Sequence, residues 1–173
     1  MMRETSGAAA PAATNGVVDA DAGFDAARAQ EVAQRVGREM MASDAASRAL
    51  GMAVEQIAPG RARLSMRVRD DMLNGFSICH GGFITTLADS AFAFACNSRD
   101  ALTVASGVAV DFVSPARAGE RLVAEAEEVS LAGRTGVYDV RVTADDGRLV
   151  AVLRGRSYRT RQRVLPPEPE PTP

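Results

Sequence analysis

The alternation of polar and apolar residues predicts a domain rich in β-strands. From residue 61 to residue 69 the two kinds alternate without a break, which is the pattern of a strand with one buried face. Pro59 and Gly60 supply a turn just before it, so residues 52–57 are expected to complete a hairpin. Short turn segments separate four further predicted strands and favour antiparallel neighbours; these strands are 102–112, 121–131, 134–143 and 148–158.

Two segments show helical patterns instead. In residues 24–41, Val32, Val36 and Met40 recur every four positions between charged residues, which predicts an amphipathic helix at the domain edge. Residues 82–97 are apolar on almost every side, so we expect a helix buried all round. One buried helix followed by antiparallel strands predicts an α+β domain, in which a sheet of five to six strands wraps around that helix.

The two ends of the chain differ from this domain. Residues 1–23 are small and polar, and residues 164–173 are rich in proline, which has no N–H to donate, so both are expected to be disordered tails around a domain at 24–163. The first residues lack the apolar core of a signal peptide, and the longest apolar stretch is too short to cross a bilayer. We therefore expect a cytoplasmic protein with no membrane partner.

Composition narrows the possible partners and cofactors. The chain has 20 Lys and Arg against 22 Asp and Glu, a net charge of −2, so no nucleic-acid partner is expected. Cys79 and Cys96 have neither metal-type nor disulfide-type spacing, and a single histidine excludes a histidine-based metal cluster. No metal or other cofactor is predicted.

The segment that leads into the buried helix carries candidate chemistry. Gly81 and Gly82 would let a ligand approach their N–H groups without a Cβ in the way. Amides at a helix N-terminus have no partner within the helix and suit an oxyanion or a polarised carbonyl. Two glycines alone are equally consistent with a simple turn that starts a helix.

Asp89 makes a catalytic site more plausible. It falls about two turns into the predicted helix, beyond the positions at which a carboxylate caps the helix. A hydroxyl of Thr85 or Thr86, or an arginine from elsewhere, could pair with it in a structural role. A carboxylate that faces a cleft near free amides is instead the combination needed for hydrolysis. Both interpretations remain open at this stage.

Other polar residues give weaker signals. His80 can orient a substrate, but a Cys79–His80 nucleophile is disfavoured because neighbours in an extended segment point to opposite sides. Both cysteines are expected to be small buried residues. The arginines of the last strands could bind phosphates, and of these Arg134 and Arg156 are the candidates, the rest being expected on a solvated sheet face.

The run from Asn74 to Asn97 resembles the PaaI-type hotdog acyl-CoA thioesterases, which are associated with phenylacetate breakdown. The resemblance rests on His80-Gly81-Gly82 and on Leu87-Ala88-Asp89-Ser90-Ala91. It extends through the later strands and covers about residues 24–161.

This resemblance implies a hotdog fold and hydrolysis of acyl-CoA thioesters, in particular phenylacetyl-CoA or hydroxyphenylacetyl-CoA. It also implies a homodimer that forms a homotetramer, with active sites built from two chains. Asp89 would be the base or nucleophile, and the facing Gly81 amide would polarise the carbonyl. The remaining roles carried over are Asn74 for the water or acyl group, His80 for the thioester region, Gly82 and Ser106 for substrate binding, and Arg134 and Arg156 for the coenzyme A phosphates.

Two other functions are compatible with a hotdog fold. A hotdog hydratase or dehydratase would need a histidine and a carboxylate placed for proton transfer at carbon, and the Asp-x-Asn-Pro-x-His type of motif is absent. A non-catalytic acyl-CoA-binding regulator would keep the fold without Asp89 and Asn74, and no basic DNA-reading module precedes the domain. The presence of both residues favours catalysis.

Overall fold

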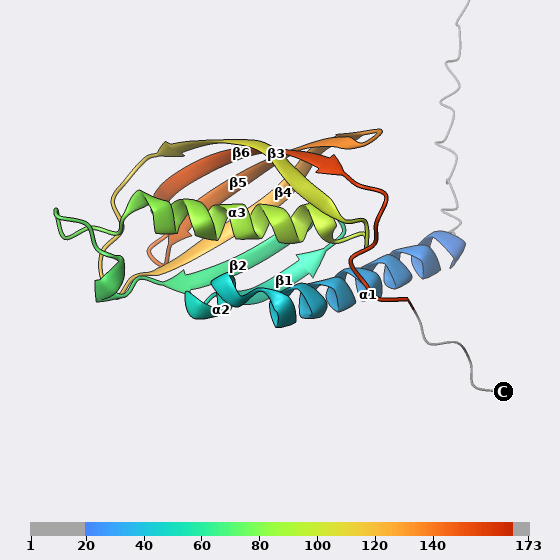
Figure 1. Cartoon of the computed structure of the whole chain (residues 1–173), viewed down its shortest axis with the longest axis horizontal. Coiled ribbons are helices and arrows are strands. Elements are labelled where there is room, and N and C mark those ends of the chain that lie inside the picture. The colour runs from blue at the N-terminus through green and yellow to red at the C-terminus, as the bar shows by residue number, and fades with distance from the viewer. Residues whose placement is uncertain (1–19, 168–173) are drawn as a thin grey trace, which may run out of the picture.

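A six-stranded antiparallel sheet curls around one central helix, α3 (Gly81–Asn97), as Figure 1 shows. The structure is a computed structural model that describes residues 20–167, with side chains described from residue 25 onward. The strands are β1 (Ala53–Ala58), β2 (Arg61–Arg67), β3 (Thr103–Phe112), β4 (Arg121–Ala132), β5 (Thr135–Ala144) and β6 (Leu149–Arg159). The predicted α+β class, the six strands and the β1–β2 hairpin are confirmed.

The order of the strands corrects one expectation. The sheet runs β1-β2-β4-β5-β6-β3, so β3 and β4 follow each other along the chain but are not neighbours. The connection between them carries the chain across to β2, where the Gly119 N–H donates to the Val68 carbonyl at 2.8 Å and the Val68 N–H donates to the Glu120 carbonyl at 2.8 Å. These contacts start β4 beside β2, and β3 remains as an edge strand paired only with β6.

The core lies between the concave face of the sheet and α3. Leu87, Ala88 and Ala91 of the helix have no exposed surface. The Phe92 ring packs against the ring of Tyr138, with 5.3 Å between the ring centroids. A Cβ placed on Gly155 would lie 2.9 Å from that Phe92 ring, so glycine is needed where helix and sheet approach most closely.

The prediction that α3 is buried all round is wrong. Gly82 and Asp89 are exposed, and Thr85 and Thr86 are half-buried. The sheet covers only one side of the helix, and the composition of the helix did not reveal which of its small residues would point away from the sheet. A stripe of small and polar residues therefore faces outward.

The helix α1 (Ala20–Ser43) lies along the β1 edge of the sheet (Figure 1), as predicted for an amphipathic edge helix. It begins at Ala20, earlier than the predicted start at residue 24. Ala33 and Val36 are fully buried, and the Gln30 amide donates to the Ile57 carbonyl at 2.7 Å. Within the described part of the chain, no helix is long and apolar enough to span a membrane.

Two short helical elements were not predicted, because neither is long enough to show periodicity. The helix α2 (Ala45–Ala49) is capped by Asp44, and its Ser47 hydroxyl lies 3.1 Å from the Ser90 hydroxyl of α3. A single 3-10 turn, η1 (Asp70–Met72), follows β2. The contact between the two serines joins α2 to α3.

The folded domain continues slightly past its predicted end at residue 163. The Asp100 carboxylate accepts hydrogen bonds from the N–H groups of Val164 at 3.1 Å and Leu165 at 2.8 Å, and Leu165 is buried. This boundary depends on the contacts of one distant residue, Asp100, with residues 163–165, which the local composition does not show. The remaining tail predictions, for residues 1–19 and 168–173, lie outside the described residues.

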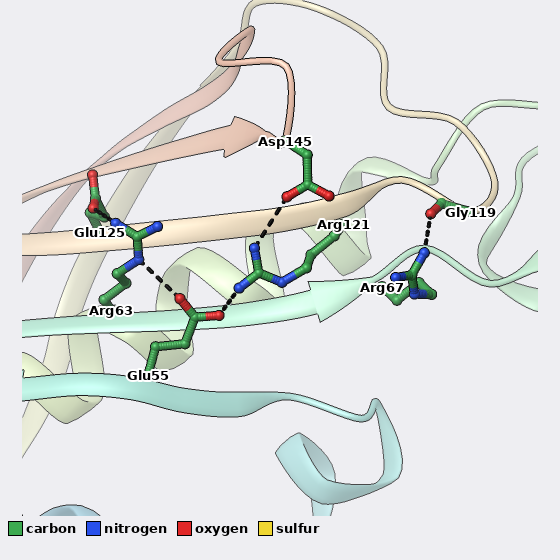
Figure 2. A network of polar contacts seen from close by, with 7 residues as sticks. All are labelled: Glu55, Arg63, Arg67, Gly119, Arg121, Glu125 and Asp145. Carbon is green, nitrogen blue, oxygen red and sulfur yellow. Dashed lines mark hydrogen bonds and ion pairs between the residues drawn. The ribbon is translucent and has the colours of Figure 1, made fainter.

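The convex face of the sheet carries a network of charged pairs (Figure 2). Glu55 pairs with both Arg63 and Arg121, which in turn pair with Glu125 and Asp145. Exposed ion pairs of this kind each contribute between about 0 and 1 kcal/mol. Their effect here is mainly to pair the arginines of this face with neighbouring carboxylates.

Candidate active site

An open pocket of about 430 Å³ lies between α3 and the edge strand β3. The helix contributes Thr85, Thr86 and Asp89, and the strand contributes residues 105–108. The pocket therefore brings together Asp89 and Ser106, two residues that the family resemblance implies for the site.

The Asp89 carboxylate has no ion pair and no hydrogen bond to any residue that the structure describes. The alternative in which a threonine pairs with Asp89 does not match the structure: the Thr86 hydroxyl donates to the Gly82 carbonyl at 2.8 Å, and no hydrogen bond joins Thr85 to Asp89 among the described residues. The carboxylate reaches solvent, yet the protein atoms on its pocket side reduce its hydration, and this raises the pKa of Asp89. An unpaired carboxylate with a raised pKa is suited to accept a proton.

Ser106 is placed by an irregularity in β3. It is the extra residue of a β-bulge, since Ala105 pairs with Ser157 and Gly107 pairs with Arg156. Its hydroxyl donates to the Arg156 carbonyl at 3.2 Å. A bulge changes the direction of a side chain relative to the regular alternation of the two faces of a strand. Here the Ser106 side chain lies at the pocket that Asp89 also lines.

The N-terminus of α3 presents one free amide. His80 caps the helix, and its Nδ1 accepts a hydrogen bond from the Gly82 N–H at 2.9 Å. The proton of the neutral ring is therefore on Nε2, which is free to donate. The Gly82 amide is engaged, whereas the Gly81 N–H has no acceptor within residues 20–167. Gly81 is thus the available donor for an oxyanion.

Asn74 forms hydrogen bonds within the turn that precedes His80. Its Oδ1 accepts from the N–H groups of Phe76 at 2.9 Å and Ile78 at 3.4 Å, and its own N–H donates to the Ile78 carbonyl at 2.8 Å. These bonds occupy the side-chain oxygen and leave the amide NH₂ group to donate elsewhere.

The cysteines do not form a nucleophilic site, as predicted. The Cys79 thiol lies 3.7 Å from the His80 carbonyl oxygen rather than on the imidazole ring. Burial raises the pKa of the Cys79 thiol and raises that of Cys96 to about 12. Both side chains are buried and remain thiols at neutral pH.

The two candidate phosphate-binding arginines differ in their surroundings. The Arg134 Nε donates to the Arg159 carbonyl at 3.0 Å, and its guanidinium lies 4.9 Å from the centroid of the Tyr158 ring. The Arg156 guanidinium has no ion pair in the described part of the chain, and its Nη1 lies 3.9 Å from the position of a Cβ on Gly107. Arg156 is thus a cation without an ion pair among residues 25–167, and it lies beside a residue that lines the pocket.

Phe112 is a residue of the site that the sequence interpretation missed. A Cβ on Gly81 would lie 2.8 Å from Cζ of Phe112, so the ring rests on the Gly81 backbone beside the free amide. The alternation within residues 102–112 places Phe112 on the same face as Val108 and Val110. That pattern would have identified a row facing the helix, but not its contact with Gly81.

One chain does not bring its free amide and its free carboxylate together. Gly81 and Asp89 are eight residues apart in α3, which is about 12 Å along the helix axis. A larger groove of about 1170 Å³ lies between α1 and the β1–β2 side of the sheet, but none of the predicted site residues line it. In residues 25–167, no group of three or more His, Cys, Asp or Glu side chains could hold a metal ion.

Comparisons with known proteins agree with this geometry. A sequence profile described as "Thioesterase superfamily" matches residues 76–151. Acyl-coenzyme A thioesterase PaaI of Escherichia coli K12 is 42% identical over 120 residues, which cover 69% of this chain and 86% of that protein. A putative esterase of Archaeoglobus fulgidus is 35% identical over 140 residues, covering 81% of this chain and 91% of the esterase.

The similarity extends to three dimensions. The solved structure of the E. coli PaaI protein, from the phenylacetic acid degradation operon, superposes with a TM-score of 0.77 and 38% identity. The superposition covers 78% of this chain and 97% of that one. The family match over residues 76–151 includes the helix and the edge strand that form the pocket.

Proposed function

This chain belongs to the thioesterase superfamily and has its hotdog fold, and on that premise we propose that it is an acyl-CoA thioesterase that hydrolyses arylacetyl-CoA to the free acid and coenzyme A. The observation that carries the proposal is the unpaired Asp89 carboxylate in a pocket beside Ser106. Phenylacetyl-CoA and hydroxyphenylacetyl-CoA are the proposed substrates, because the similar E. coli protein comes from a phenylacetic acid degradation operon.

In the proposed reaction, Asp89 takes a proton from a water molecule as that water attacks the thioester carbonyl carbon. The Gly81 N–H stabilises the oxyanion that forms, a contribution of typically about 3 to 4 kcal/mol for one such donor. The C–S bond then breaks, the thiolate of coenzyme A leaves, and the proton held by Asp89 passes to that sulfur. Direct attack by the carboxylate through an anhydride is the variant in which Asp89 is the nucleophile.

The two groups must come from different subunits. The separation of about 12 Å along one helix is too long for both to contact one carbonyl group, so Asp89 of one chain acts with the Gly81 amide of another. We therefore propose a homodimer as the smallest active unit, with two dimers forming a homotetramer in the cytoplasm.

The residues around Gly81 have supporting roles in this scheme. The free Nε2–H of His80 orients the thioester, and the free amide group of Asn74 positions the water or the acyl carbonyl. Gly82 contributes space rather than a donor, because its N–H is already bound to His80. The Ser106 hydroxyl lies at the pocket rim to bind the substrate.

The nucleotide end of coenzyme A needs cations outside the pocket. Arg156 is the stronger candidate because its guanidinium has no ion pair among the described residues and lies next to Gly107. Arg134 keeps its terminal nitrogens available while its Nε is bound to a carbonyl. Both are proposed contacts for the phosphates.

The test is thiol release from phenylacetyl-CoA, hydroxyphenylacetyl-CoA and a few linear acyl-CoA esters, by the wild-type protein and by Asp89→Asn. We expect release with the aryl substrates and its loss in a variant that keeps the wild-type fold and oligomeric state. Stoichiometric binding of acyl-CoA with no thiol released from any ester would overturn the proposal in favour of an acyl-CoA-binding regulator. Unchanged release by Asp89→Asn would remove Asp89 from the mechanism.

A further inference from the structure

We propose that the Ser157 hydroxyl binds the ring hydroxyl of a para-hydroxyphenylacetyl group and so selects the acyl group of the substrate. The inference rests on the proposed function, because it assumes that an arylacetyl thioester is hydrolysed at Asp89. It adds the residue that recognises the far end of the aryl ring, which makes the hydroxylated ester the better substrate.

Ser157 of β6 is buried without a hydrogen-bond partner. The residue is 1% exposed, and its hydroxyl is the one buried side-chain nitrogen or oxygen without a partner in the described part of the chain. Ser98 is equally buried, but its hydroxyl donates to the Ala95 carbonyl at 2.8 Å and accepts from the Gly60 N–H at 2.7 Å. A buried polar group without a partner costs free energy, and a polar group of a bound substrate would supply the missing bond.

The hydroxyl adjoins the pocket that Asp89 lines. Ser157 pairs with Ala105 of β3, and Ala105 is an exposed residue of the pocket wall. Residues directly opposite each other on neighbouring strands share a face, with Cβ atoms about 4.5 to 5.5 Å apart. Gly155, two residues earlier in β6, packs against Phe92 of α3, so this face is the one turned to the helix. Ser157 therefore lies on the helix-facing side of the sheet, one strand further in than the pocket wall.

Two contacts give the level of Ser157 along α3. Gly81 lies against Phe112 at the end of β3, and the Asn97 side chain bonds to the first residue of that strand. The helix and β3 therefore run antiparallel, and even spacing between these contacts places Ser157 and its partner in β3 beside Ala93. Ala93 is half-buried and carries only a methyl group, as does the pocket residue opposite Ser157, so the side chains on both sides of this space are small.

This level suits the length of an arylacetyl group. Ala93 lies four residues beyond Asp89, which is about one turn and about 6 Å along the helix axis. In a para-hydroxyphenylacetyl thioester, ordinary bond lengths put the ring oxygen roughly 6 to 7 Å from the carbonyl carbon. A substrate with its carbonyl at Asp89 and its ring directed toward the C-terminal end of α3 would bring its hydroxyl to Ser157.

The Ser157 hydroxyl is free to turn toward such a ring. It lies over Gly136 of β5, where a Cβ would be only 2.7 Å from its oxygen. Serine side chains have three staggered positions, and rotation about χ1 breaks no hydrogen bond here because none is made. A hydroxyl both donates and accepts, so it can pair with a phenol in either direction. A phenylacetyl group has no polar atom at this position and would leave Ser157 unsatisfied, which disfavours it.

Thiol release from para-hydroxyphenylacetyl-CoA and phenylacetyl-CoA by the full-length protein tests the assignment. Ser157→Ala removes the hydroxyl, and Ser98→Ala is the matched control because it removes a buried hydroxyl that is bonded inside the protein. We expect the wild type and Ser98→Ala to prefer the hydroxylated ester by roughly three- to tenfold in kcat/KM, as for one neutral hydrogen bond. Ser157→Ala should lose this preference through the hydroxylated ester alone, with no fall in the thermal midpoint, because the hydroxyl it removes is bonded to nothing in the protein.

Binding of two thioethers of coenzyme A, the S-(para-hydroxyphenethyl) and S-phenethyl compounds, is measured in parallel by calorimetry because it needs no hydrolysis. The wild type should bind the hydroxylated thioether more tightly, and Ser157→Ala should bind both alike. The same preference in Ser157→Ala as in wild type, or an equal loss for both esters with a lower thermal midpoint, would overturn this inference while the thioesterase function stands. No thiol release from any ester, with a binding preference that Ser157→Ala abolishes, would reject the proposed function and still support the Ser157 contact.

Discussion

Gly81 and Asp89 lie on the same side of α3, about two turns apart, and neither the Gly81 N–H nor the Asp89 carboxylate has a partner among the residues described. Each chain thus carries one free N–H group and one free carboxylate at separate places along the same helix. This arrangement supports two equivalent sites between two chains, and it leads to four predictions.

The first prediction isolates the Gly81 amide. Proline is well tolerated at the first position of a helix but has no N–H, so Gly81→Pro removes the donor while the helix start is kept. We expect kcat to fall by roughly 10² to 10³, as for the loss of one oxyanion donor. Gly81→Ala is the matched control, because it also brings a Cβ against the Phe112 ring but retains the N–H. Equal activities of the two variants, measured as thiol release, would contradict a role for the amide.

The second prediction concerns the sharing of sites between chains. Asp89→Asn and Gly81→Pro homodimers are each expected to be nearly inactive. In a dimer that contains one chain of each kind, one of the two sites keeps both groups, so co-refolded equimolar mixtures should regain about a quarter of the wild-type rate. A mixture of Asp89→Asn with Asp89→Ala is the control and should regain nothing. Absence of recovery, with mixed dimers shown by differential tagging, would place both groups in one chain.

The third prediction follows from the raised pKa of Asp89. The folded protein holds this proton more tightly than the unfolded chain does, so stability falls as the pH rises through the window above the ordinary aspartate pKa of about 3.9. Asp89→Asn removes that charge, and we expect its thermal midpoint to exceed that of the wild type at pH 7. The difference should shrink toward pH 4 and below. A variant less stable than the wild type at pH 7 would indicate that the carboxylate has a structural partner.

The fourth prediction addresses coenzyme A. If Arg156 binds a phosphate, Arg156→Gln should raise KM for an acyl-CoA by severalfold, up to about tenfold for a loss of 1.4 kcal/mol, with little change in kcat. The matching acyl-pantetheine, which lacks the nucleotide, should show no such change. Arg154→Gln is the control on the same strand, because Arg154 already pairs with Asp139. An equal rise in KM in both variants would mean that Arg156 acts only through the overall charge of the surface and does not bind a phosphate directly.

Some features of the site were readable from local sequence. The His80-Gly81-Gly82 run predicts a helix start with free amides, and the structure places the N-cap and the free N–H there. The sequence also predicts that Asp89 lies too far into the helix to cap it, and in the structure the N-cap is His80. These inferences succeed because caps and helix positions depend on residues only a few places apart.

The strands were also predictable, because the alternation of polar and apolar side chains is itself the mark of a face turned to the core. Their order was not: β3 could have paired with β4, its neighbour in the chain, but lies at the edge beside β6. That choice depends on contacts such as Gly119 to Val68, which join segments far apart in sequence.

The sequence by itself therefore determined the six strands, the two long helices and the candidate roles of Gly81 and Asp89, since each follows from neighbouring residues. Only the tertiary structure decided that Asp89 lacks a partner, that Ser106 lines the same pocket from a bulge in β3 and that the Phe112 ring lies against Gly81. Those facts depend on how a helix and an edge strand are placed against each other. Pairing energies between segments far apart in the chain set that placement, and no local pattern encodes them.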